Sequence, residues 1–155
     1  MGKDTITMFT DGAALGNPGP GGYGTVLLWG EYKKEFSEGY RRTTNNRMEL
    51  LAVIIGLEAL KKPGMRIRVY TDSKYVEQAI SKGWLQNWVK KGFKGKKNVD
   101  LWKRYLQAAD GHFISMQWVK GHAGIPGNER CDELASSAAA NHPVLVDEGY
   151  ESSSL

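Results

Sequence analysis

The sequence predicts an α/β fold, a mixed β-sheet flanked by helices within one domain. Three observations support this prediction. The chain has 155 residues, the usual size of a single domain with a sizeable core. Its segments follow the order three strands, helix, strand, helices, strand, helix. We find neither an internal repeat nor a linker, so residues 1–155 are expected to form a single unit.

Three strands are expected in the first part of the chain. Residues 5–10 alternate between polar and apolar side chains and favour β-structure, so they predict a strand that ends at Asp11. A turn-rich loop over residues 16–22 follows. Residues 23–29 and 33–40 predict two further strands, and the short connection between them indicates an antiparallel meander.

A long helix is expected next. It begins at Thr44 or Asn45, which are both good capping residues. It ends at the lysines of residues 61–62, because their charges suit the negative end of a helix and a Pro-Gly pair at 63–64 stops it. Residues 50–57 are apolar nearly all round, which predicts that this helix packs deep against the sheet.

The later elements complete the predicted fold. They are a strand over residues 66–70 that leads to Asp72, a helix over 73–80 capped by Ser73, a helix over 99–109, a strand over 113–119, a loop over 121–127 and a helix over 128–141. The folded core is therefore expected to span about residues 6–142. Residues 143–155 include a run of serines and are expected to form a loose C-terminal tail.

The composition excludes several classes of protein. The apolar and charged fractions, 41% and 25%, are ordinary for a globular protein and exclude disordered and fibrous chains. Cys131 is the only cysteine, which excludes an intramolecular disulfide and a cysteine-rich zinc site. No apolar run is long enough to cross a membrane, and the first residues lack the apolar block of a signal peptide. We therefore expect a cytoplasmic protein with no membrane partner.

The positive charge is concentrated in residues 82–97. The chain has a net charge of +4, but six lysines and no acidic residue lie in this segment, so the rest has a net charge of −2. Trp84, Trp88 and Phe93 are interspersed among the lysines. Such a patch indicates a polyanionic partner, and above all a nucleic acid. The alternative is a solvated lysine face over a small hydrophobic core that includes both tryptophans.

Four acidic residues point to a metal site: Asp11, Glu49, Asp72 and Asp132. Each lies at an expected strand end or on an expected helix, where it can face a common pocket. Carboxylates that are held close together repel one another, so a fold gathers them only around cations. Mg²⁺ and Mn²⁺ prefer oxygen ligands, and two such ions can hold the attacking and the leaving oxygen of a phosphoryl transfer.

A structural role for these acidic residues is the alternative. An aspartate at a strand end more often forms a turn or caps a helix than binds a metal. Glu49 weakens this alternative, because it lies one turn inside a helix among largely apolar neighbours, where an unpaired carboxylate is costly. Arg47 could still neutralise the cluster in place of a metal by pairing with Asp11 or Asp72.

Two further motifs are ambiguous. Residues 19–24 match the Gly-x-Gly-x-x-Gly pattern of dinucleotide-binding loops, but a strand-like segment follows where that function needs a helix. A tight connection between strands is therefore favoured. His122 lies in a glycine-flanked loop, and it is either an ordinary surface histidine or a group that transfers protons beside a metal site.

Six motifs give the chain a family resemblance. They are Phe-Thr-Asp-Gly at 9–12, Gly-Asn-Pro-Gly-Pro-Gly-Gly-Tyr-Gly at 16–24, Thr-Thr-Asn-Asn-Arg-Met-Glu-Leu at 43–50, Thr-Asp-Ser at 71–73, Trp-Val-Lys-Gly-His-Ala-Gly at 118–124 and Asn-Glu-Arg-Cys-Asp-Glu-Leu-Ala at 128–135. With these motifs in this order, over about residues 6–150, the chain resembles bacterial type-1 ribonuclease H.

This resemblance implies an RNase H fold, a five-stranded mixed sheet whose first three strands are antiparallel, with helices on both faces. It implies an endoribonuclease that hydrolyses the RNA strand of RNA–DNA hybrids by a two-metal-ion mechanism and leaves 5′-phosphate and 3′-hydroxyl ends. The implied cofactors are two Mg²⁺ ions in the substrate complex, for which Mn²⁺ can substitute. The expected partner is the RNA–DNA hybrid alone, with no obligatory protein partner, and the expected state is a monomer.

The resemblance also implies roles for individual residues. The four acidic residues match the family's metal-binding carboxylates, and His122 matches its catalytic loop histidine. The implied substrate-binding residues are Asn17, Asn45 and Asn46 for the minor groove of the hybrid, Arg42 and Thr44 for a DNA phosphate, and Trp84, Trp88, Lys90, Lys91, Lys94, Lys96 and Lys97 in the basic protrusion. Lys74, close to the expected active site, departs from the family because it replaces an amide-bearing residue, and it is also expected to bind the substrate.

The chain departs from the family in the basic protrusion. Residues 93–98 form a shorter segment than in well-known members, and Phe93 replaces a common tryptophan, which affects the expected affinity for the hybrid. Two rival functions also stay open. One is another two-metal enzyme on the same fold, such as an integrase core, which usually carries additional DNA-binding domains. The other is a catalytically silent hybrid-binding module, against which the presence of all four carboxylates argues.

Overall fold

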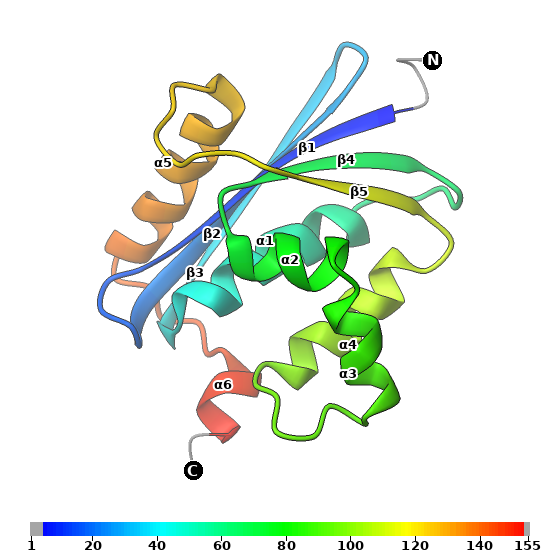
Figure 1. The fold of residues 1–155 in the computed structure, drawn as a ribbon. Coiled ribbons are helices and arrows are strands. Elements are labelled where there is room, and N and C mark those ends of the chain that lie inside the picture. The colour runs from blue at the N-terminus through cyan, green and yellow to red at the C-terminus, as the bar shows by residue number, and fades with distance from the viewer. Residues whose placement is uncertain (1–4, 154–155) are drawn as a thin grey trace.

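Within residues 5–153, the part of the chain that the computed structural model describes, five strands form one mixed sheet in the order β3-β2-β1-β4-β5 (Figure 1). They are β1 (Thr5–Ala14), β2 (Gly19–Trp29), β3 (Tyr32–Thr43), β4 (Arg66–Thr71) and β5 (Phe113–Trp118). The first three strands pair antiparallel, whereas β4 pairs parallel with both β1 and β5. The predicted mixed sheet is confirmed.

Helices lie on both faces of this sheet (Figure 1). They are α1 (Asn45–Glu58), α2 (Lys74–Ser81), α3 (Trp84–Lys90), α4 (Val99–Ala109), α5 (Pro126–Ala140) and α6 (Glu148–Ser153). Helix α1 packs on one face and carries α4 on its outer side, while α5 packs on the opposite face against β1, β2 and β3. None of the described helices is both long and apolar enough to span a bilayer.

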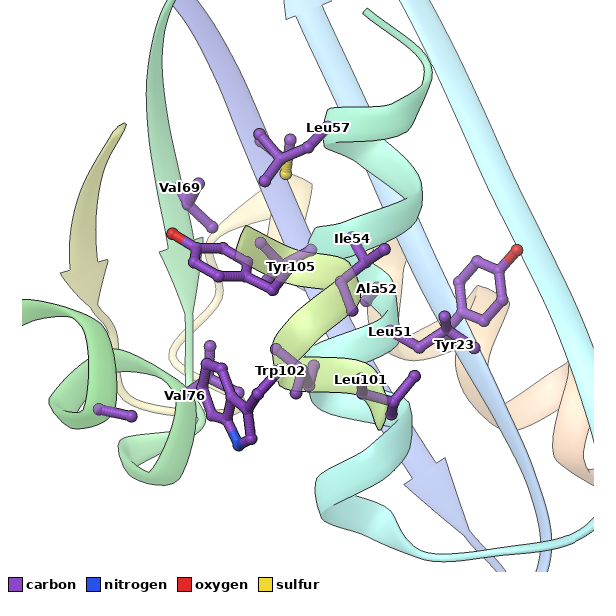
Figure 2. Close-up of a cluster of buried hydrophobic side chains, with 14 of the residues drawn as sticks. Tyr23, Leu51, Ala52, Ile54, Leu57, Val69, Val76, Leu101, Trp102 and Tyr105 are labelled. Atoms are coloured by element: carbon purple, nitrogen blue, oxygen red, sulfur yellow. The ribbon is translucent and has the colours of Figure 1, made fainter. Parts of the chain in front are cut away.

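Helix α1 is buried between the sheet and α4, as its apolar sequence predicts. Every residue from 47 to 54 is buried. Figure 2 shows Leu51 and Ile54 of α1 in the same cluster as Trp102 of α4, which is completely buried. Burying a large apolar side chain contributes about 1.5–3 kcal/mol relative to leaving it in water. This packing fixes α1, and every side chain that α1 carries, relative to the sheet.

The same helix ends earlier than the sequence predicts. Its last residue is Glu58, so the lysines of residues 61–62 lie beyond the helix and not in its final turn. The amide of Leu60 donates to the carbonyl oxygen of Leu57 (3.1 Å), a spacing of three residues that tightens the chain and closes the helix.

Strands β1 and β2 are longer than predicted. Their ladder continues past Asp11 as far as Ala14, so Asp11 lies inside β1 and not at its end. The glycine-rich residues 19–24 belong to β2, and no helix opens there, which excludes the dinucleotide-binding alternative. The glycines let α5 approach the sheet instead, because a Cβ atom on Gly24 would collide with the carbonyl oxygen of Cys131.

The segment that begins at Pro143 is packed against β3, which differs from the expected loose tail. The amide of Arg41 donates to the carbonyl oxygen of Leu145 (2.8 Å). The side chain of Arg41 also forms an ion pair with Glu151 of α6 (2.9 Å). The expectation is therefore corrected as far as residue 153, and residues 154–155 lie outside the described part of the chain.

A charge cluster around the buried Arg47 joins this segment to the start of α1; we call Arg47, Asp100 and Asp147 the Arg47 cluster. Arg47 is 2% exposed and donates to Asp147 (2.8 and 2.9 Å) and to Asp100 of α4 (2.9 and 2.7 Å). Burial alone would lower the pKa of the Arg47 guanidinium, but these hydrogen bonds raise it. The alternative in which Arg47 neutralises Asp11 or Asp72 is wrong.

Candidate active site

Three carboxylates from different elements converge at one end of the inner strands β1 and β4. Asp11 comes from β1, Glu49 from α1, and Asp72 from the residue that follows β4. One oxygen atom of each carboxylate lies within 4.8 Å of those of the other two. The parallel β1–β4 ladder ends at the pair Phe9 and Tyr70, so Asp11 and Asp72 lie side by side beyond it, at the carboxyl end of β4, where α/β sheets commonly bind ligands.

Helix α1 reaches this end of the strands because Gly12 has no side chain. A Cβ atom on Gly12 would collide with the backbone of Met48 and with the amide nitrogen of Glu49. The amide of Gly12 donates a hydrogen bond to Oδ1 of Asp11 (2.9 Å). The close contact between β1 and α1 therefore sets the separation of the Asp11 and Glu49 carboxylates.

The start of α2, strand β5 and the loop after β5 together fix the position of Asp72. Ser73 caps α2, because its hydroxyl oxygen accepts a hydrogen bond from the amide of Val76 (3.1 Å). The indole Nε1 of Trp118 donates to the carbonyl oxygen of Asp72 (3.0 Å). A Cβ atom on Gly121 would lie 2.8 Å from Oδ2 of Asp72, so the loop after β5 packs directly on this carboxylate.

The surroundings of the cluster disfavour negative charge. Burial raises the pKa of Asp11 to about 8, and the neighbouring carboxylates of Asp72 and Asp132 contribute to this rise. Burial also raises the pKa of Glu49, with further contributions from Asp11 and Asp72. Asp132 of α5 is thus close to Asp11, although it is not among the three carboxylates that converge within 4.8 Å.

The carboxylates fit a bound cation. Oε1 of Glu49 and Oδ1 of Asp72 are buried, and neither has a hydrogen-bond partner among the described residues. An unsatisfied buried acceptor costs about 1–3 kcal/mol, and more when it is charged. A divalent cation at this position would satisfy both oxygens and lower the carboxylate pKa values. The ligand atoms are all oxygens, a set that suits hard cations.

Two basic residues lie beside Asp72. His122 is exposed and has a φ of 58°, and it directly follows Gly121, the residue that packs on Asp72. Lys74 is the exposed first residue of α2, and its Nζ lies 5.1 Å from the ring centre of Trp118. Both predicted residues are therefore exposed on segments that adjoin Asp72.

A second group of predicted residues lines a hollow of about 810 Å³ beside the start of α1. The predicted substrate-binding residues in this hollow are Asn17, Thr44, Asn46, Lys96 and Lys97. Asn45 adjoins it, because its amide donates to Oδ1 of Asn17 (3.1 Å). The hollow thus brings the loop after β1, the first turn of α1 and the end of the lysine-rich segment to one place.

Other residues of this hollow were missed by sequence reasoning. Asn98 lines it together with Asp100 and Tyr150. Nη1 of Arg47 donates to Oδ1 of Asn98 (3.4 Å), and Nδ2 of Asn98 donates to the hydroxyl of Tyr75 (3.1 Å). No local pattern marks Asn98 or Tyr150, because one precedes a helix in a lysine-rich loop and the other lies in the segment that was expected to be loose.

Five predicted residues lie outside both groups and are exposed: Arg42, Trp84, Lys90, Lys91 and Lys94. Trp88 packs edge-on against Trp102 with a distance of 5.7 Å between ring centres. Nζ of Lys96 lies 5.0 Å from the Trp88 ring centre. Trp88 therefore belongs in part to a small hydrophobic core, as the alternative interpretation of this segment predicts.

The chain is similar to known proteins over nearly its whole length. The family model described as RNase H matches residues 3–140. The chain belongs to the RNase H family. The Ribonuclease H of Klebsiella pneumoniae subsp. pneumoniae is 55% identical to it over 150 residues, which cover 94% of this chain and 95% of that protein.

Solved structures with the RNase H fold agree with this assignment. LC9-RNase H1, a type 1 RNase H with the type 2 active-site motif, has a TM-score of 0.82 at 32% identity and covers 98% of this chain and 81% of its own. LC11-RNase H1, solved in complex with an RNA/DNA hybrid, shares the fold with a TM-score of 0.69 at 24% identity, over 88% of this chain and 97% of its own. The chain is an enzyme of the ribonuclease H class, which are metal-dependent hydrolases.

Replacing Gly12 by alanine tests the contact between β1 and α1 in this RNase H. We expect the added methyl group to push α1 away, at a cost of about 1–3 kcal/mol, and to separate Asp11 from Glu49. Thermal unfolding should show a lower Tm in EDTA and a smaller rise in Tm on adding Mg²⁺. Ala14→Ser, on the same strand, is the control. A Gly12→Ala variant with the wild-type response to Mg²⁺ would contradict the prediction.

Proposed function

We propose that this chain is an endoribonuclease that hydrolyses the RNA strand of RNA–DNA hybrids. The observation that carries the proposal is the convergence of Asp11, Glu49 and Asp72, two of which have buried oxygens without a donor. Membership of the RNase H family and 55% identity to a Ribonuclease H support the same substrate. A module that only binds nucleic acid would not be expected to have such a cluster of carboxylates with buried, unsatisfied oxygens.

We infer that the metal is Mg²⁺, for which Mn²⁺ can substitute, and that its ligands are Asp11, Glu49, Asp72 and Asp132. Two bound ions would lower the pKa of the attacking water and neutralise the leaving 3′-oxygen. The closely spaced carboxylates provide the negative charge that holds two divalent cations in one small volume. Since water attacks, and not the neighbouring 2′-hydroxyl, the products carry 5′-phosphate and 3′-hydroxyl ends.

His122 is proposed to transfer a proton during turnover. Its loop contacts Asp72 through Gly121, and its side chain is exposed to solvent. Histidine exchanges protons near neutral pH, so a residue in this position can take up or release a proton as the phosphodiester is cleaved. The glycines that flank this loop allow it to adjust to the substrate.

The proposed readers of the two strands lie beside the first turn of α1. Asn17, Asn45 and Asn46 would contact the RNA strand, whose 2′-hydroxyls distinguish it in the wide minor groove. Arg42 and Thr44 would bind a phosphate of the DNA strand. The hydrogen bond from the Asn45 amide to Asn17 supports this arrangement, because it couples the loop after β1 to the helix that carries Glu49.

The basic segment of residues 82–97 is proposed to bind the phosphate backbone of the hybrid. Its lysines are exposed, and Lys96 and Lys97 lie in the same hollow as the proposed strand readers. Trp84 is 42% exposed and offers a surface beside these charges. Lys74 would add a phosphate contact next to the carboxylates. Lysine–phosphate contacts carry no sequence preference and weaken as salt increases.

We further infer that the enzyme acts as a monomer in the cytoplasm, without an obligatory protein partner. The residues of the proposed metal site and of the proposed strand-reading site all come from one chain. No second copy is needed to complete either site.

A gel assay with one end-labelled sequence tests the proposed function. The sequence is presented as RNA–DNA hybrid, single-stranded RNA, double-stranded RNA and double-stranded DNA, each with Mg²⁺ and with EDTA. We expect internal cuts in the RNA strand of the hybrid alone, with 5′-phosphate ends, and no cuts in EDTA. Cleavage of double-stranded DNA would support the integrase-like rival, and binding of the hybrid without cleavage would support the silent module.

A further inference from the structure

The outer face of β4 and β5 carries a hollow that the proposed hydrolysis does not use. It has a volume of about 440 Å³ and lies at the start of both strands, away from the carboxylates. Ile67 and Val69 of β4 are buried in the core, so Arg66 and Arg68, which alternate with them, point outward. Helix α5 packs on the other three strands, which leaves this part of the sheet open (Figure 1).

The lining of this hollow is basic and aromatic. The Arg66 guanidinium lies 5.4 Å from the ring centre of Phe113, a side chain that is 62% exposed. The register of the strands places Arg68 opposite Ser115, and Thr5 adds a second hydroxyl. No carboxylate in the described part of the chain forms an ion pair with either arginine.

This combination suits single-stranded nucleic acid. The two guanidinium groups attract phosphates, and the exposed aromatic ring offers a face on which an unpaired base can stack. Sheets that bind single strands use aromatic side chains in this way. A duplex keeps its bases stacked internally, so it would leave Phe113 without a partner. An acidic peptide would engage the arginines but would not account for the exposed ring.

The outward face of β4 leads from the hollow toward the end of the strand that Asp72 follows. Arg66, Arg68 and Tyr70 share one face of β4, and Asp72 follows two residues after Tyr70. The Tyr70 ring stacks on Phe9 of β1, with 5.1 Å between ring centres and 20° between ring planes. At about 3.3 Å per residue, Arg66 lies about 20 Å from Asp72 along the strand.

We propose that this hollow binds a single-stranded extension of the substrate that runs along β4 from the cleavage site. This inference rests on the function proposed above. A hybrid with an unpaired RNA or DNA end would then be held at two places, its duplex part at the carboxylates and its single strand at Arg66, Arg68 and Phe113. The enzyme would favour hybrids at the boundary between paired and unpaired nucleic acid.

The first test measures binding alone, in EDTA, by the fluorescence anisotropy of labelled single-stranded oligonucleotides of about 12 nucleotides. We expect the Kd to rise about fivefold or more in Arg66→Gln/Arg68→Gln and in Phe113→Ala, which keeps the charge. Lys33→Gln/Lys34→Gln removes the same charge from β3 and is the matched control. Equal losses in this control, or wild-type binding by Phe113→Ala, would overturn the inference. The inference would also be overturned if a glutamate peptide competed with the labelled oligonucleotide as effectively as the unlabelled oligonucleotide does.

The second test compares the cleavage of blunt hybrids with that of hybrids carrying a single-stranded overhang at each of the four ends in turn. We expect at least one overhang to lower the KM about fivefold for the wild type, and the arginine double variant to lose this advantage. Blunt cleavage without any overhang effect would overturn the inference and leave the proposed function intact. If no hybrid is cleaved, the proposed function fails, and the binding test in EDTA still decides whether the hollow holds single strands.

Discussion

An Asp11→Asn variant is expected to cleave RNA–DNA hybrids about a thousandfold more slowly than the wild type, because a lost metal ligand removes several kcal/mol of stabilisation from the transition state. Asp11 lies close to Glu49 and Asp72, and it also interacts electrostatically with Asp132. Initial rates on an end-labelled hybrid at saturating Mg²⁺ measure the effect. Asp110→Asn, which removes an exposed carboxylate, is the control. A variant within tenfold of the wild type would exclude Asp11 as a ligand.

The same substitution should stabilise the protein when no metal is bound. The pKa of Asp11 is raised from 3.8 to about 8. Between these two pH values the folded state therefore holds a proton on Asp11 that the unfolded state has released. The contribution of this group to stability is therefore present below about pH 4 and is lost as the pH rises through 8. Asparagine cannot ionise and avoids the loss, which we expect to be about 1–3 kcal/mol.

Urea unfolding in EDTA at pH 5 and pH 8.5 tests whether Asp11→Asn stabilises the metal-free protein. The Asp11→Asn variant should exceed the wild type in unfolding free energy at pH 8.5 and approach it at pH 5. Saturating Mg²⁺ should then stabilise the wild type more than the variant, because the cation binds the folded carboxylates. A variant that is less stable than the wild type at pH 8.5 would contradict the raised pKa.

An Arg47→Met variant is expected to lose about 3–5 kcal/mol of unfolding free energy, because it leaves a buried carboxylate without its counter-charge. Asp147 is 8% exposed and receives two hydrogen bonds from Arg47. Methionine resembles the apolar stem of arginine, so the loss of unfolding free energy comes mainly from removing the positive charge. Urea unfolding at pH 7 measures it. Activity should fall as well, since Glu49 follows two residues later on the same helix.

Two matched variants separate burial from charge removal. Arg104→Met removes an arginine that pairs with Glu58 at the surface, and we expect a loss below about 1 kcal/mol. Adding Asp147→Asn to Arg47→Met removes the stranded charge and should recover part of the stability. If Arg47→Met and Arg104→Met lower the unfolding free energy by the same amount, burial does not make the Arg47 cluster more stabilising than a surface ion pair.

The sequence predicts the convergence of Asp11, Glu49 and Asp72 well because local patterns fix the place of each. Asp11 and Asp72 each accompany an alternating segment, and neighbouring parallel strands bring them to one end of the sheet. Glu49 stands out because a charged residue within an apolar helix needs a partner. The continuation of β1 beyond Asp11 was not predicted, since its glycine and alanine residues have low β-propensity and extend the ladder only through pairing with β2.

Contacts between distant segments explain what the sequence did not predict. Asp147 contacts Arg47 across 100 positions, and nothing near residue 147 indicates a folded segment. Arg66 and Phe113 form the open hollow only because of the register between β4 and β5. Trp88 was grouped with the substrate-binding residues by its lysine neighbours, whereas its packing depends on Trp102 in another helix.

In a chain that is still being synthesised, the Arg47 cluster cannot close. Arg47 leaves the ribosome 100 residues before Asp147, so for that interval its guanidinium lacks the more buried of its two carboxylate partners. The two hydrogen bonds from Arg47 to Asp147 can therefore form only after residue 147 has been translated and has folded back onto β3. A nascent chain that already contains all four acidic residues of the proposed site still lacks the contact that ties the start of α1 to the C-terminal segment.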